Sequence, residues 1–152
     1  MTRSPAFTYA FYIIAMFAMG FTTAYFFQPG DWYDALAKPE FNPPNWVFGP
    51  VWTLLYVLIG ISGAKVALSF IPGGMLGLWW LQWVLNGAWT AAFFGAQMIG
   101  VALIVILFLL AVIIAYIVSE WEESKTASLL FVPYAAWVAF ATALNATIWW
   151  MN

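Results

Sequence analysis

The sequence of 152 residues contains no cysteine and no histidine, and only 7% of its residues are charged. The lack of cysteine excludes disulfides and thiolate chemistry, and the lack of both residues removes the usual ligands of zinc and haem. Four basic and six acidic residues give a formal net charge of −2, which excludes the basic surface that holds nucleic acid. We therefore expect no metal, no other cofactor and no nucleic-acid partner.

Hydrophobic residues, by contrast, make up 66% of the chain and fall into five long runs. The runs cover approximately residues 6–27, 46–70, 75–94, 99–119 and 126–151. Each is close to the roughly 20 residues that cross the hydrocarbon core of a bilayer. Inside a bilayer the backbone must satisfy its own hydrogen bonds, so each run is expected to be a helix. The sequence predicts an all-α, multi-pass integral membrane protein, a five-transmembrane-helix bundle forming a single domain over residues 1–152.

The first apolar run has a second interpretation as a secretory signal peptide, because Arg3 precedes it and small residues lie near its end. Its apolar stretch is longer than the roughly 7–15 residues of a signal-peptide core, so we expect a retained helix. Five spans would place Arg3, Lys65 and Lys125 on one side of the membrane and Lys38 on the other. The positive-inside rule then favours a cytoplasmic N-terminus, but so few charges do not identify which membrane holds the protein.

The most informative segment is residues 32–56, WYDALAKPEFNPPNWVFGPVWTLLY, which ends the first connection and enters the second run. Its two consecutive prolines prevent a helix from continuing through the connection. Beyond them, Trp52 and Tyr56 share one helix face because they are one turn apart. The aromatic residues of the connection, such as Tyr33, also fit an ordinary interfacial belt. Trp52 and Tyr56 lie deeper, so that alternative explains them less well.

The third run carries Asn86 at membrane depth, on the same helix face as Trp89 and Phe93. An amide at this depth is expected to point inward and find a partner. Small residues also recur along this run at a spacing that lets another helix approach closely. They are Gly87, Ala91 and Gly95, with Ala88, Ala92 and Ala96 beside them. The approaching helix belongs either to the same chain or to a second subunit, and the sequence leaves both open.

The fifth run has a comparable stripe, because Trp137, Ala141 and Asn145 follow one another at one-turn intervals. The small Ala141 between two larger side chains leaves space, which either a ligand or a side chain from a neighbouring helix would fill. In the first run, Gly20 and Ala24 are interpreted as a close-packing pair rather than as part of a site.

The runs together supply three aromatic stripes and two inward amides, with no ionisable group at the middle of the membrane. Neither a carboxylate pair for acid–base catalysis nor a nucleophile with an adjacent base is present at that depth. Shape, stacking and a few hydrogen bonds remain as the available chemistry. This combination favours binding of a large, flat, apolar ligand.

Four segments resemble the TspO/MBR family, which comprises bacterial tryptophan-rich sensory proteins and the mitochondrial translocator protein, or peripheral benzodiazepine receptor. They are WYDALAKP, NPPNWVFGPVWTLLY, LNGAWTAAFF and VPYAAWVAFATALN, in family order and at family spacing over nearly the whole chain. The resemblance implies five membrane helices, commonly a homodimer, and a ligand pocket covered by the connection 28–45. It also implies porphyrin as a ligand, with cholesterol and synthetic aromatic drugs bound by eukaryotic members.

By this resemblance, ten residues would bind the ligand. They are Tyr33, Pro43, Trp52, Tyr56, Asn86, Trp89, Phe93, Trp137, Ala141 and Asn145. Trp52 and Trp137 match the tryptophans associated with light-dependent porphyrin breakdown in some bacterial members, and would be catalytic if this chain has that activity. The chain departs from the family in two places. Glu40 and Phe41 stand where many members have a second aromatic pair, and the stretch after Asn145 lacks the Tyr and Arg of the cholesterol-recognition pattern.

Four functions follow from these observations, and we favour a membrane receptor or carrier for tetrapyrroles. The others are an enzyme that degrades porphyrin with light and oxygen, a transporter of tetrapyrroles or sterols, and a scaffold whose aromatic residues only pack. The absence of a carboxylate at depth argues against ion-coupled transport.

Overall fold

All regular structure in the described residues, 4–69 and 74–152 of the computed structural model, is helical. The α-helices are α1 (Pro5–Phe26), α2 (Asp31–Ala35), α3 (Phe48–Leu68), α4 (Gly74–Thr90), α5 (Ile99–Glu120) and α6 (Lys125–Met151). A short 3-10 helix, η1 (Asn45–Val47), leads into α3, and a π-helix, η2 (Ala91–Gly95), continues α4. Five of the α-helices coincide with the apolar runs, whereas α2 lies within the connection between the first two runs.

The prediction of an all-helical membrane protein is confirmed for these residues, but the count of five spans is reached only in part. Among the described residues, four helical segments are long and apolar enough to cross a membrane. They are Pro5–Phe26, Asn45–Leu68, Ile99–Glu120 and Lys125–Met151. The third apolar run differs because its α-helical part, α4, has only 17 residues before the hydrogen-bond pattern changes to that of η2.

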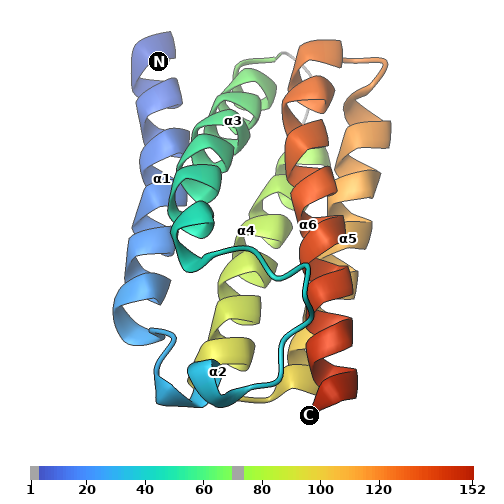
Figure 1. The fold of residues 1–152 in the computed structure, drawn as a ribbon. Helices are drawn as coiled ribbons and strands as arrows, with labels where there is room; N and C mark the ends of the chain where they lie inside the picture. Colours follow the sequence, from blue (N-terminus) through green and yellow to red (C-terminus); the bar gives the residue numbers. More distant parts are fainter. Residues whose placement is uncertain (1–3, 70–73) are drawn as a thin grey trace.

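The five long helices lie side by side (Figure 1), and their contacts close a ring. Going round the ring, α1 packs on α3, α3 on α6, α6 on α5 and α5 on α4, and a smaller contact joins α4 to α1. The start of α1 and the end of α6 lie at opposite ends of the bundle, and α2 lies at the end where α6 finishes (Figure 1). The connecting segment between α1 and α3 therefore covers one mouth of the ring.

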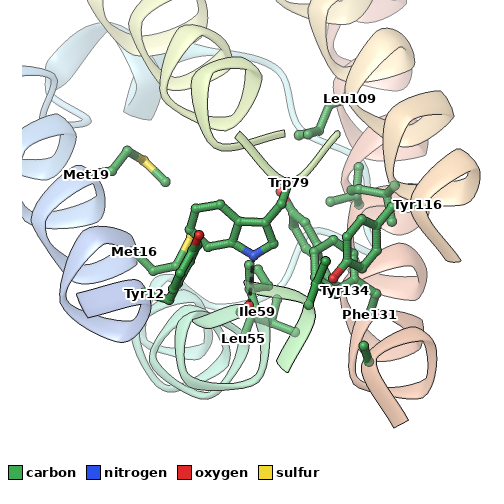
Figure 2. Close-up of a cluster of buried hydrophobic side chains, with 14 of the residues drawn as sticks. Tyr12, Met16, Met19, Leu55, Ile59, Trp79, Leu109, Tyr116, Phe131 and Tyr134 are labelled. Atoms are coloured by element: carbon green, nitrogen blue, oxygen red, sulfur yellow. Dashed lines mark hydrogen bonds between the residues drawn. The ribbon is translucent and has the colours of Figure 1, made fainter. Parts of the chain in front are cut away.

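The half of the bundle away from the connecting segment is closely packed around Trp79 of α4, which is fully buried (Figure 2). Its indole Nε1 donates a hydrogen bond to the Ile59 carbonyl of α3 at 3.0 Å, and its ring lies 4.7 Å from the ring of Tyr12. A Cβ added at Gly63 would come within 2.5 Å of Nε1. Glycine is therefore required at position 63, because it lets the indole lie directly against the backbone of α3.

Polar groups in this packed half bond to one another, as an apolar environment demands. Ser62 of α3 donates its hydroxyl to the Ala127 carbonyl of α6 at 2.8 Å. Its oxygen also lies 2.9 Å from the hydroxyl of Tyr116 on α5, which must then be the donor of that bond. The Tyr116 ring stacks on Phe131 with 4.1 Å between centroids. Three helices are thus joined at one buried point.

Candidate ligand-binding cavity

A cavity of about 270 Å³ lies in the half of the bundle next to the connecting segment. Its walls come from α1, α3, α4, η2 and α6, and its cover comes from the connecting segment. The lining residues are Gly20, Thr23, Ala24, Phe27, Pro29, Tyr33, Asn45, Phe48, Trp52, Tyr56, Asn86, Trp89, Thr90, Phe94, Trp137 and Ala141. Aromatic rings from four different parts of the chain therefore face one space.

The structure brings together seven of the ten residues that the sequence predicts for a ligand site. These are Tyr33, Trp52, Tyr56, Asn86, Trp89, Trp137 and Ala141. The remaining three, Pro43, Phe93 and Asn145, do not line the cavity. Ala141 borders the cavity, so the space beside it is not filled by a side chain from a neighbouring helix. That these seven residues bind a ligand stays a prediction.

Phe93 is displaced from the cavity by the π-helix. In an α-helix, residues 86, 89 and 93 share a face, but the wider turn of η2 contains one more residue and shifts the positions that follow. As a result Phe94 lines the cavity. Phe93 is instead 3% exposed and packs 6.2 Å from the ring of Tyr33 in the connecting segment.

Asn145 supports the cavity wall from behind. Its Oδ1 accepts a hydrogen bond from Nε1 of Trp89 at 3.0 Å, and its Nδ2 donates to the Ile99 carbonyl at 3.0 Å. Both ends of the amide are thus occupied within the protein, and the side chain is 2% exposed. The role of Asn145 in this structure is to fix the Trp89 ring and to join α4, α5 and α6.

Asn86 presents a hydrogen-bond acceptor to the cavity. Its Nδ2 donates to the Tyr134 hydroxyl at 2.8 Å, and that hydroxyl in turn donates to Oε1 of Gln82 at 3.0 Å. No described residue donates to Oδ1 of Asn86, and the residue lines the cavity. A ligand with an N–H or O–H group could therefore bond to this oxygen, whose position is fixed by the buried chain of bonds behind it.

The three cavity indoles differ in how their N–H groups are used. Trp89 Nε1 is bonded to Asn145, as described above. Within the described part of the chain, the N–H groups of Trp52 and Trp137 have no acceptor. The Trp52 ring lies 5.5 Å from that of Tyr56, and the Trp137 ring lies 5.7 Å from that of Phe48. Trp52 and Trp137 thus offer both a stacking face and a free donor.

One wall of the cavity, formed by α1, was missed by the sequence reasoning. Gly20, Thr23 and Ala24 line it. Gly20 is a close-packing residue as predicted, since a Cβ there would collide with the ring of Tyr56. The same close approach brings Tyr56 to the cavity. The spacing of Gly20 and Ala24 was the available signal, but small residues alone do not separate a packing surface from a cavity wall.

Two positions in the stripe of small residues on α4 and η2 pack against other parts of the same chain. A Cβ at Gly87 would lie 3.5 Å from Met19 of α1, and one at Gly95 would lie 2.6 Å from Phe27. Of the two alternatives that the sequence left open, packing within one chain therefore holds for Gly87 and Gly95. The neighbouring Ala88 and Ala96 are exposed on the outer surface.

The cover of the cavity is organised by Lys38 and Tyr33. Nζ of Lys38 donates to the carbonyls of Asp34 and Leu36, at 3.1 and 3.2 Å. It also lies 4.6 Å from the centroid of the Tyr33 ring, a cation–π distance. Burial raises the pKa of the Tyr33 hydroxyl, so this group remains a neutral donor at physiological pH.

These features define an all-helical, multi-pass membrane protein that encloses an aromatic cavity near one end of its bundle. Sequence comparison places it more narrowly, because the sequence model of the TspO/MBR family matches residues 11–151. The chain belongs to the TspO/MBR family, and it is an integral membrane protein.

Relatives come from bacteria and animals. The chain is 38% identical to protein CrtK of Rhodobacter capsulatus, over 95% of this chain and 92% of the relative. It is 40% identical to the tryptophan-rich protein TspO of Chlorobaculum tepidum, over 89% of each chain. Its identity to the human translocator protein is 39%, over 78% of this chain and 73% of the relative.

Proposed function

We propose that this protein is a membrane receptor or carrier that binds porphyrins and similar flat, apolar molecules in the cavity. The observation that carries the proposal is the convergence of three indoles, Trp52, Trp89 and Trp137, from three helices on one space. Indole faces stack on flat aromatic molecules, and the few polar groups around them would set the orientation of the ligand. The free Oδ1 of Asn86 would accept a bond from a pyrrole N–H.

The size of the cavity indicates how such a ligand would enter. Its volume of about 270 Å³ is slightly below the roughly 300–1,000 Å³ typical of sites for drug-sized molecules. A full macrocycle therefore requires the cover to move outward. The cover is a connecting segment and not a long helix, so it can move without separating the helices of the ring.

The proposal includes a fifth membrane span made by α4 together with η2. The two elements run from Gly74 to Gly95 without a charged residue. At about 1.5 Å per residue, a helix of this length matches a hydrocarbon core of roughly 30 Å. It also includes a homodimer, for which the exposed Ala88 on α4 supports close helix contact.

The proposed binding is tested by fluorescence titration with protoporphyrin. The double variant Trp52→Phe, Trp137→Ala replaces one cavity indole by a smaller ring and removes the other entirely. We therefore expect quenching of the remaining tryptophans to need at least about tenfold more ligand. Trp150→Phe is the matched control, because Trp150 is 86% exposed and far along α6 from Trp137. Identical titrations for the double variant and the control would rule out this cavity as the porphyrin site.

A second candidate function is favoured by the free N–H groups of Trp52 and Trp137. In light-dependent degradation, the bound porphyrin would absorb the light, molecular oxygen would be the oxidant, and one of these indoles would relay the radical. Illuminated protein should then convert porphyrin to a defined open-chain product, whereas the Trp137→Phe variant should only bleach it. Equal bleaching by both proteins would indicate ordinary photosensitisation.

A further inference from the structure

The residue that follows α6, Asn152, is bonded to the cover of the cavity. Its Oδ1 accepts a hydrogen bond from the backbone N–H of Ala37 at 3.0 Å, and its Nδ2 donates to the Ala37 carbonyl at 3.0 Å. The same Nδ2 donates to the Ile148 carbonyl of α6 at 2.8 Å. One amide side chain thus pairs with both backbone groups of Ala37 and is itself oriented by α6. We call the two bonds to Ala37 the Asn152 latch.

The latch acts on a segment that is internally tied. Lys38, next to Ala37, holds the carbonyls of Asp34 and Leu36 and lies over the ring of Tyr33. The Leu36 N–H also donates to the Tyr33 carbonyl at 3.3 Å. Residues 33–38 are therefore expected to move together, so that holding Ala37 also holds Tyr33, which lines the cavity.

The remaining contacts of this segment with the bundle are of a different kind. Tyr33 packs edge-on against Phe94, with 5.4 Å between ring centroids, and further along the cover Phe41 lies 6.3 Å from Phe140. Such ring contacts tolerate sliding, whereas a two-bond pairing between an amide and a backbone unit fixes both position and direction. The latch is therefore the contact that specifies where the cover closes.

We propose that Asn152 is a positioning residue that latches residues 33–38 over the cavity and so sets the rate at which the cavity opens. For a ligand, this would govern entry and exit. That last step rests on the proposed function, whereas the latch itself concerns the free protein. The chain has no cysteine, so opening can be measured without any ligand by placing one thiol in the cavity.

The reporter is Ala141→Cys, and the readout is the rate of its labelling by N-ethylmaleimide in the free protein. Asn152→Ala removes the two exposed bonds to Ala37 together with the bond to the Ile148 carbonyl. It should raise this rate roughly threefold to tenfold, because each exposed bond contributes modestly in the presence of water. Met151→Ala in the same background is the matched control, since it shortens a neighbouring side chain that is 45% exposed.

A variant on the other side of the latch tests the same bonds without altering α6. Ala37→Pro removes the N–H donor of the latch and keeps the carbonyl acceptor, and the preceding Leu36, at φ −64° and ψ 140°, already has the backbone conformation that a following proline requires. We expect a smaller increase in labelling for Ala37→Pro than for Asn152→Ala. The double variant should label no faster than Asn152→Ala alone, because both changes remove the same pairing.

Two outcomes would overturn the proposal. One is an unchanged labelling rate in Asn152→Ala at an unchanged melting temperature, and the other is full additivity of the two changes. If Asn152→Ala does not fold, the rate for Ala37→Pro decides alone. Dissociation of protoporphyrin from the same variants, without the reporter, should accelerate in the same order. Faster labelling in a protein that binds no porphyrin would leave the latch established and remove the proposed function.

Discussion

The two halves of the bundle use tryptophan in opposite ways. In the packed half, the indole N–H of Trp79 bonds to the Ile59 carbonyl, and that of Trp83 bonds to the Ala15 carbonyl at 2.9 Å. These rings join α4 to α3 and to α1. In the cavity half, Trp52 and Trp137 border empty space, and no described residue accepts from their N–H groups. The third cavity indole, Trp89, has its N–H bonded to Asn145. A high tryptophan content therefore has two separate meanings in one chain, and what distinguishes them is whether the ring borders packed side chains or the cavity.

The backbone differs between the halves as well. Near the cavity, the chain forms a π-helix, a 3-10 helix and the five-residue α2. The one non-glycine residue with positive φ among the described residues, Gln97 at 57°, also follows η2. The long α-helices of the packed half have none of these departures. At η2 the departure has a direct effect on the cavity, because the wider turn places Phe94 instead of Phe93 in its lining.

The largest expected difference between the halves is in stability. Trp79→Ala removes a fully buried ring together with its hydrogen bond, so we expect it to lower the free energy of unfolding by about 3–5 kcal/mol. Trp52→Ala should cost under about 2 kcal/mol, because this ring already borders a cavity. Denaturant unfolding of both variants in the same detergent measures the contrast. Equal losses would contradict the division into a packed half and a cavity half.

A second prediction distinguishes two neighbouring residues, Phe93, which does not line the cavity, and Phe94, which does. Phe93→Ala should lower the free energy of unfolding by about 3 kcal/mol, since Phe93 is buried against the connecting segment. Phe94→Ala should cost less, but should weaken protoporphyrin binding roughly twofold to tenfold through the loss of a ring contact. Unfolding and titration of each variant test this pairing. The reverse pattern would mean that the helix keeps its α-helical phase through residue 94.

The smallest expected effect concerns the backbone after η2. At φ 57°, Gln97 has a conformation that glycine adopts without steric cost. We expect Gln97→Gly to raise the free energy of unfolding by about 0.5–1 kcal/mol. Gln97→Ala is the matched control and should give no gain, because alanine keeps the Cβ. A gain of similar size in both variants would assign the effect to the side chain instead of the backbone.

Much of the fold could be predicted from the sequence, because bilayer thickness and backbone hydrogen bonding leave few options for long apolar runs. Residues of the site that lie on one regular helix could also be predicted. Trp52 with Tyr56 and Trp137 with Ala141 follow from helical spacing alone, and all four line the cavity.

Prediction and structure differ at residues whose position relative to the cavity does not follow from regular spacing along one helix. Phe93 was predicted on the assumption of unbroken α-helical spacing, which η2 interrupts. Asn145 was predicted to face a ligand, but its partners, Trp89 and the Ile99 carbonyl, come from other helices and cannot be identified from its own stripe. The α1 wall was missed because glycine, alanine and threonine have no distinctive chemistry. The Asn145 and α1 cases depend on contacts between segments that are distant in sequence, whereas the Phe93 case depends on a local change of helix type.

The order of helices around the ring has a consequence for biogenesis. α6 packs between α3 and α5, which share no extensive contact of their own, and it is synthesised after both. While the ribosome is still producing α5, the inserted chain has an open side at this place and lacks the wall formed by Trp137 and Ala141. The cavity therefore comes into existence only when α6 inserts, so partly translated chains in the membrane have no enclosed site to occupy.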